Sequence, residues 1–233
     1  MLEQEKKIKG FNILELLVVL VIVGIIGGLS VPGFMKWVKK REVENMAVKI
    51  TTMMTNMNTQ LQRGSFAFMQ LYMTADEEGV EFFTKGMGMN SFTDARSGEN
   101  EANFKLMNDP DDRCSAPSGA TDDDSDYWDN TKVSYVKLDV FDKKVTTDFF
   151  DATEKDGAVC FNRDGTFYSN QGFMEDTNNK MIYICELNDS RMCMIDFNGE
   201  PVAGFEKNLY RISWSIFGNV KKEKWMGNDW VQK

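Results

Sequence analysis

The chain has no histidine among its 233 residues. It therefore lacks the side chain most often used as a general base, as a zinc ligand and as the partner of a nucleophilic serine or cysteine. Positive charge is also scarce, since 27 lysines and arginines stand against 36 aspartates and glutamates, for a formal net charge of −9. A protein that binds polyanions needs a basic surface. The composition thus argues against an enzyme and against nucleic acid as a main partner.

Cysteine is scarce as well, and the four cysteines lie in the second half of the chain or just before it: Cys114, Cys160, Cys185 and Cys193. If a turn is centred on Asp189, Cys185 and Cys193 lie opposite each other across a hairpin, close enough to form a disulfide. Cys114 then remains to pair with Cys160. Four buried thiols are the alternative. Zinc binding is disfavoured because histidine and C-x₂-C spacing are both missing.

One long apolar run occupies residues 11–31, where only Asn12, Glu15 and Ser30 are polar. As a helix this run is roughly 31 Å long, enough to cross a hydrocarbon core. A cleaved secretory signal has a shorter apolar region followed by a small-residue cleavage site, which does not match this segment. A buried helix of a globular protein is the other alternative. The run predicts a membrane anchor.

Glu15 is the unusual residue of this run, because a charged side chain costs about 2.5–3.5 kcal/mol at the centre of a membrane segment. Near the edge of the membrane the cost is smaller, and Glu15 is then a boundary carboxylate without a role. The alternative is that Glu15 pairs with a positive charge from another chain.

The segment KGFNILELLVVLVIVGIIGGLSVP resembles the N-terminal signal of type IV prepilins and type II secretion pseudopilins. In that family a prepilin peptidase cuts after the glycine that ends a short basic leader, and methylates the new first residue. The resemblance implies cleavage between Gly10 and Phe11, and N-methylation of Phe11. It makes Glu15 the expected register contact between subunits. It also makes Gly24 and Pro32 the expected positions of a helix kink.

The resemblance also implies an organisation for the whole chain. The expected parts are a cytoplasmic leader (1–10), a transmembrane and fibre-core helix (11–34), an amphipathic helix (35–63) and an extracytoplasmic β-rich domain (64–233). Such a protein crosses the bacterial inner membrane once, with a periplasmic C-terminal domain, and later enters a filament. The implied partners are the prepilin peptidase, other pilin or pseudopilin subunits, the inner-membrane assembly platform and membrane lipid. No cofactor, metal or catalytic residue is expected.

An amphipathic helix is predicted to follow the apolar run, to about Arg63. Apolar residues recur there at spacings of three and four, which gives one apolar stripe. The stripe consists of Val43, Met46, Ala47, Ile50, Met53, Met54, Met57 and Leu61. A stripe of this kind is more typical of a core than of a promiscuous methionine-rich groove. Gly64 is the predicted C-terminal cap.

The rest of the chain predicts strands, because short segments rich in β-branched and aromatic residues alternate with turn signals. The expected strands lie within residues 65–73, 80–83, 132–141, 157–162, 166–169, 181–187, 192–197 and 210–217, with an NG turn at 198–199. Apolar residues alternate with polar ones at Val136, Leu138 and Val140, and again at Ile212, Trp214 and Ile216, as in a sheet with one wet face. The predicted fold class is α+β, with the long helix packed on a mainly antiparallel β-sheet domain.

Two β segments, AVCFNRDGTF and RMCMIDFNGEPVAGF, resemble the paired segments of the GspH/FimT-like pseudopilin domain, which implies a minor subunit. Some FimT-like minor pilins take up DNA, and the segment KKEKWMGNDWVQK combines cations with tryptophans as a single-strand platform does. The alternative is that Trp225 and Trp230 pack back on the sheet. An unrelated membrane-anchored binding domain is a third interpretation.

A long acidic loop is expected at about residues 86–131. Between Asn108 and Asn130 it holds eight aspartates and one basic residue, Arg113. Calcium takes six to eight oxygen ligands, but the order of residues in an EF-hand loop is missing. A solvated acidic loop is the preferred interpretation.

Overall fold

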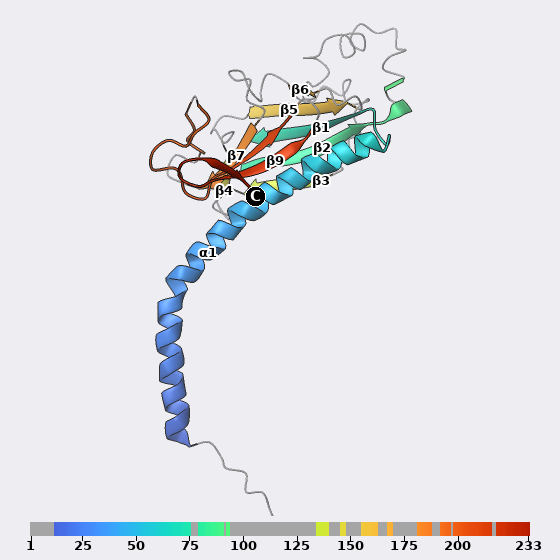
Figure 1. Cartoon of the computed structure of the whole chain (residues 1–233). Coiled ribbons are helices and arrows are strands. Elements are labelled where there is room, and N and C mark those ends of the chain that lie inside the picture. The colour runs from blue at the N-terminus through green and yellow to red at the C-terminus, as the bar shows by residue number, and fades with distance from the viewer. Residues whose placement is uncertain are drawn as a thin grey trace, which may run out of the picture. The chain divides into compact units, whose positions relative to one another are not determined.

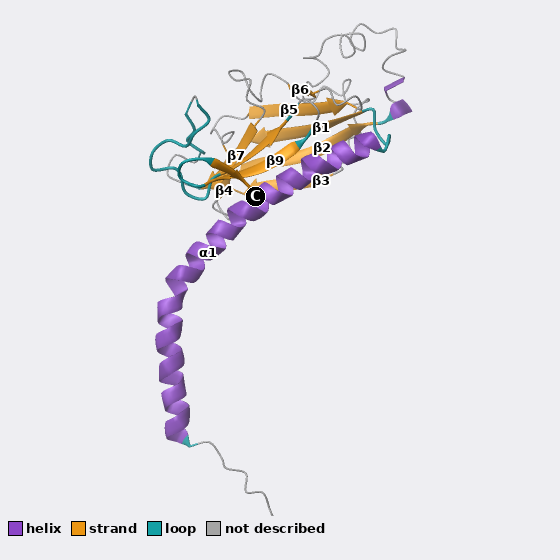
Figure 2. Cartoon of the chain, viewed as in Figure 1, coloured by secondary structure: helices purple, strands orange, loops and turns teal. Residues whose placement is uncertain are grey.

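The fold is α+β, with a long helix and two five-stranded antiparallel sheets (Figures 1 and 2). The computed structural model describes residues 12–75, 79–90, 92–93, 134–139, 145–147, 155–162, 167–169, 181–187, 192–196, 198–215 and 218–233. The chain divides into two compact units, Met1–Lys39 and Lys40–Lys233. The predicted leader and most of the predicted acidic loop lie outside the described residues. The α+β class predicted from the sequence is confirmed.

Helix α1, Ile13–Gln62, ends at the glycine expected from the sequence. Gly64 has a φ of 75°, in the left-handed region. Its N–H donates to the carbonyl of Leu61, and the N–H of Ser65 donates to the carbonyl of Gln60. These two hydrogen bonds form a Schellman motif, which satisfies carbonyls left free at the last turn. The predicted cap at Gly64 is confirmed.

The part of α1 that belongs to the second unit buries its apolar stripe. Every residue of the stripe is at most 4% exposed: Val43, Met46, Ala47, Ile50, Met53, Met54, Met57 and Leu61. They pack with apolar side chains of both sheets in one core. Burying each large side chain of this kind is worth roughly 1.5–3 kcal/mol. The stripe is therefore core, as its spacing predicted.

The first sheet has the strand order β3-β2-β1-β5-β6. Its strands are β1 (Phe68–Ala75), β2 (Gly79–Met87), β3 (Ser134–Asp139), β5 (Lys155–Asn162) and β6 (Phe167–Ser169). In the centre, Leu71 of β1 pairs with Thr84 of β2 on one side and with Val159 of β5 on the other. Leu71 and Val159 face the core shared with α1. The opposite face carries a second cluster, in which the rings of Tyr72 and Phe83 are 4.6 Å apart.

The second sheet has the strand order β10-β9-β8-β7-β4. Its strands are β4 (Val145–Thr147), β7 (Met181–Glu186), β8 (Tyr210–Trp214), β9 (Val220–Trp225) and β10 (Trp230–Gln232). On β8, Ile212 and Trp214 point into the shared core, which confirms the alternation predicted for this strand. The other face carries a small cluster of its own, around Tyr183, Leu209 and Trp225. The sheet thus buries apolar side chains on both faces, so the single wet face expected from this alternation is wrong for this sheet.

One strand prediction is wrong, and three strands of the structure were not predicted. The strand expected at residues 192–197 is absent from the described part of that segment, where a single bridge joins Ile195 to Pro201. Strands β4, β9 and β10 were not expected. The predicted NG turn is confirmed: Gly199 has a φ of 76°, and its N–H donates to the Asp196 carbonyl at 3.0 Å.

Cys185 and Cys193 form the predicted disulfide, with their Cα atoms 5.8 Å apart. The supporting backbone differs from the predicted hairpin. Thr146 of β4 pairs with Cys185, and the N–H of Cys193 donates to the carbonyl of Thr147 at 3.3 Å. Strand β4 therefore brings the two cysteines together. Cys160 is also disulfide-bonded, whereas Cys114, its predicted partner, lies outside the described residues.

Replacing both Cys185 and Cys193 by serine is expected to lower the free energy of unfolding by roughly 2–3 kcal/mol, because the bridge closes a short loop. The measurement is the melting temperature of the double variant and the parent protein, both in detergent without reductant. Reducing the parent protein is expected to lower the melting temperature further, because reduction also breaks the disulfide of Cys160. Equal melting temperatures would show that the bridge contributes nothing to stability.

Candidate functional site: an exposed apolar helix

The first half of α1 presents apolar side chains in all directions. Between Ile13 and Ile26, every large apolar side chain is 47–84% exposed. A soluble monomer rarely exposes a continuous apolar surface of this size, and such surfaces mark contacts with proteins or membranes. The segment Ile13–Ile26 is called the apolar segment below. It is the candidate functional site of the chain.

Glu15 lies in the first turn of α1, at the start of the apolar segment. The Asn12 side chain accepts a hydrogen bond from the N–H of Leu14 at 3.3 Å, and the Asn12 carbonyl accepts one from the N–H of Glu15 at 3.0 Å. Asn12 is thus the N-cap of the helix. A carboxylate in the first turn interacts favourably with the helix dipole. The exposed Glu15 side chain remains available for a partner, which is what the predicted register contact requires.

The other predicted residues of the site have separate outcomes. Gly10 and Phe11, the predicted processing residues, lie outside the described residues. At Gly24 an added Cβ would meet nothing within 4 Å. The backbone is helical at both Gly24 and Pro32. A kink at these two positions stays a prediction.

Within the described residues, no single helix meets the length and hydropathy criteria for a membrane span. The stretches Ile13–Gly28 and Gly33–Gln62 meet them only together, as a bent pair. The membrane anchor therefore stays a prediction.

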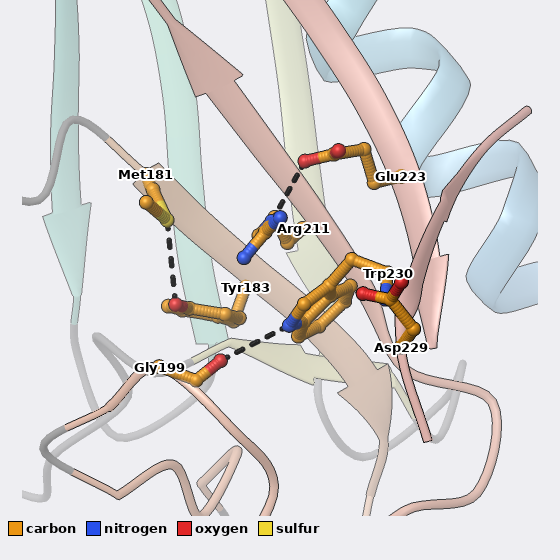
Figure 3. Close-up of polar contacts among 7 residues, drawn as sticks. All are labelled: Met181, Tyr183, Gly199, Arg211, Glu223, Asp229 and Trp230. Carbon is orange, nitrogen blue, oxygen red and sulfur yellow. Dashed lines mark hydrogen bonds and ion pairs between the residues drawn. The ribbon is translucent and has the colours of Figure 1, made fainter. Parts of the chain in front are cut away.

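The two tryptophans of the predicted DNA-binding segment pack against other side chains of the chain. Trp225 is 8% exposed, and its ring lies 5.3 Å from the ring of Trp230. The Trp230 Nε1–H donates to the carbonyl of Gly199 at 3.2 Å. The guanidinium of Arg211 lies 4.5 Å from the Trp230 ring centroid and also bonds Glu223 at 2.7 Å (Figure 3).

These contacts favour the packed alternative for the tryptophans. A platform for single-stranded nucleic acid needs aromatic faces on which bases stack. The Trp230 ring instead stacks with Arg211, whose charge is paired with Glu223 (Figure 3). No observation on this face supports a nucleic-acid site.

A cluster of lysines on the opposite face of the second sheet was missed in the sequence. Lys222 and Lys224 of β9 place their Nζ atoms 5.9 and 5.3 Å from the ring centroid of Tyr210. Burial, with a smaller contribution from Glu44, raises the pKa of Tyr210 to about 12. The alternation of Val220, Lys222 and Lys224 on one face of a strand was the available signal, but the run KKEK is also typical of a solvated tail.

Among the described residues, no group of three or more histidine, cysteine or acidic side chains is placed to hold a metal ion. The acidic segment between Asn108 and Asn130 lies outside them. Comparison with protein family models, with curated proteins and with solved structures found no match.

Proposed function

We propose that the chain is a minor pilin or pseudopilin, a structural subunit of a type IV pilus or type II secretion filament. The single observation that carries the proposal is the apolar segment Ile13–Ile26, whose large apolar side chains are all exposed and whose first turn holds one carboxylate. A helix that is apolar on every side needs to be surrounded by lipid or by other helices. A filament subunit uses both environments in turn, first the membrane and then the fibre core.

The rest of α1 supports the same function. Beyond Lys40 the helix is amphipathic, and one side of it forms part of the core of the β domain. A subunit of this kind carries its folded domain on the helix that assembles. No catalytic residue and no cofactor is part of the proposal.

Glu15 is the residue that we propose to form an ion pair between subunits. Cleavage after Gly10 would create an α-amino group on Phe11, with a pKa of about 7.7–8.0 when unperturbed. This ammonium can pair with Glu15 of a neighbouring subunit, because the two charges are opposite at neutral pH. A buried polar contact of this kind fixes register at some cost in stability.

The test is the mass of the chain after co-expression with a prepilin peptidase. We expect loss of residues 1–10 and the addition of one methyl group to Phe11. A Gly10→Val variant is the control, because it removes the glycine before the cleaved bond, and it is expected to keep the full-length mass. An unprocessed chain in the presence of active peptidase would contradict the proposal.

A further inference from the structure

Two lysines of β9 lie over the Tyr210 ring in the second unit, and two more lysines act on one of them, although the chain as a whole carries a net charge of −9. They are Lys40, Lys222, Lys224 and Lys233, called the lysine cluster below. Lys222 and Lys224 cover the Tyr210 ring, and the backbone N–H of Lys233 donates to the carbonyl of Lys222 at 3.1 Å. Lys40 and Lys233 are exposed.

The lysines of the cluster are close enough for their charges to repel one another. The pKa of Lys224 is lowered, first by burial and then by the charge of Lys40, with a further contribution from Lys233. Glu44 acts in the opposite direction and is the acidic group that faces both Lys224 and Tyr210. The charged groups that act on Lys224 are therefore two lysines and one glutamate, so the charge around Lys224 is net positive. Such a surface favours an anionic partner.

The position of Lys40 in the sequence indicates the chemical class of this anionic partner. Lys40 follows Val31, the last residue of the apolar run, by roughly 14 Å of helix. The polar headgroup layer of a bilayer is about 5–8 Å thick on each side. Lys40 would then lie within about one Debye length of the headgroups at physiological salt. Lys40 also acts on the pKa of Lys224, so these two lysines of the cluster are close to each other.

We infer that the lysine cluster binds the anionic headgroups of the membrane, and holds the β domain against the bilayer before the subunit assembles. The inference rests on the membrane anchoring contained in the proposed function. The net negative charge of the whole chain favours the same orientation of the β domain. An anionic membrane repels the acidic faces of the domain and attracts the lysine cluster. An anionic segment of a second protein is the alternative occupant that the experiment excludes.

The experiment uses the full chain in lipid nanodiscs made of phosphatidylcholine alone or of phosphatidylcholine with phosphatidylglycerol. Lysines are acylated briefly, and the modified positions are quantified by mass spectrometry. We expect phosphatidylglycerol to lower acylation of Lys40, Lys224 and Lys233 by about fivefold, the factor that corresponds to the attraction of one lysine to an anionic surface. Lys207, an exposed lysine outside the cluster, is the internal control and is expected to react equally in both lipids.

Two variants with the same change in charge sharpen the test. Lys40→Glu with Lys233→Glu changes two exposed residues of the cluster, whereas Arg63→Glu with Lys207→Glu changes two exposed residues outside it. The effect of phosphatidylglycerol on Lys224 is expected to disappear in the first variant and to persist in the second. High salt is expected to remove it from the parent protein.

Three results would overturn the inference. Equal acylation of the cluster in both lipids would exclude lipid binding. Protection by inorganic phosphate in phosphatidylcholine discs would indicate a phosphate site, and protection that appears only as more copies are loaded per disc would indicate a second chain. A chain that does not co-elute with the discs at all would contradict the membrane anchor itself, which separates failure of the proposed function from failure of this inference.

Discussion

Replacing Glu15 by glutamine is expected to remove the chain from assembled filaments while leaving it in the membrane. Glutamine keeps the size and hydrogen-bonding ability of glutamate but loses the charge. If Glu15 pairs with the new α-amino group of a neighbouring subunit, the variant leaves that ammonium unpaired in an apolar fibre core. Removing one partner of a buried ion pair costs about 3–5 kcal/mol, so incorporation should fall on the order of a hundredfold or more.

The amount of the Glu15→Gln variant that inserts into the membrane should rise or remain the same. A carboxylate within an apolar segment opposes insertion, and its removal relieves that cost. The measurement is the amount of the chain in the sheared filament fraction relative to the membrane fraction, determined in the native host. Loss from the filament together with full recovery in the membrane is the expected result.

Glu206→Gln is the matched control for this prediction, because it removes the same charge from an exposed residue of the second unit. That variant is expected to enter filaments like the parent protein. Wild-type incorporation of the Glu15→Gln variant would exclude the charge pair, and would leave Glu15 as a boundary carboxylate. Equal loss in both variants would show that assembly responds to net charge instead of to this position.

The helical part of the fold could be predicted from the sequence because its signals are local. The three-and-four spacing from Val43 to Leu61 identified the buried side of α1, and Gly64 identified its end. Both signals act within one or two turns of helix, so a single sequence contains them. The exposed apolar segment follows from hydropathy in the same way.

Strands β9 and β10, at one edge of the second sheet, could not be predicted, because they form through contacts between residues that are distant in the sequence. The run at residues 221–224 is charged, which is typical of a solvated tail. In the structure the Nζ atoms of Lys222 and Lys224 lie over the Tyr210 ring, and Glu223 pairs with Arg211. Long charged side chains can cover an apolar surface while their charges stay in water, and hydropathy averages hide this arrangement.

The disulfide shows how a correct pairing can arise from a wrong local structure. The prediction placed Cys185 and Cys193 across a hairpin. The structure instead holds Cys193 by the hydrogen bond from its backbone N–H to the carbonyl of Thr147 of β4, a three-residue strand without a strong sequence signal. The two cysteines are only eight residues apart in the sequence, which limits the distance between them in space whatever the local structure.

Replacing Ile50 by alanine is expected to lower the free energy of unfolding of the second unit by about 2–5 kcal/mol. Ile50 is 0% exposed and lies in the middle of the stripe that packs on both sheets. Its removal leaves a cavity among side chains that come from α1 and from strands far away in the sequence. In a domain of this size the loss corresponds to a decrease of roughly 5–15 °C in melting temperature.

Val48→Ala is the matched control, since Val48 is also a β-branched residue of α1, two positions away, but is 42% exposed. Alanine has a higher helix propensity than valine, so this variant should change stability by no more than about 0.5 kcal/mol. Both variants are melted as the full chain in the same detergent, followed by near-ultraviolet circular dichroism. Because detergent surrounds the apolar segment equally in each, a difference between them reports the packing of α1 on the sheets. Equal melting temperatures would mean that α1 is not part of the core, and would remove the link between the β domain and the helix that we propose to assemble.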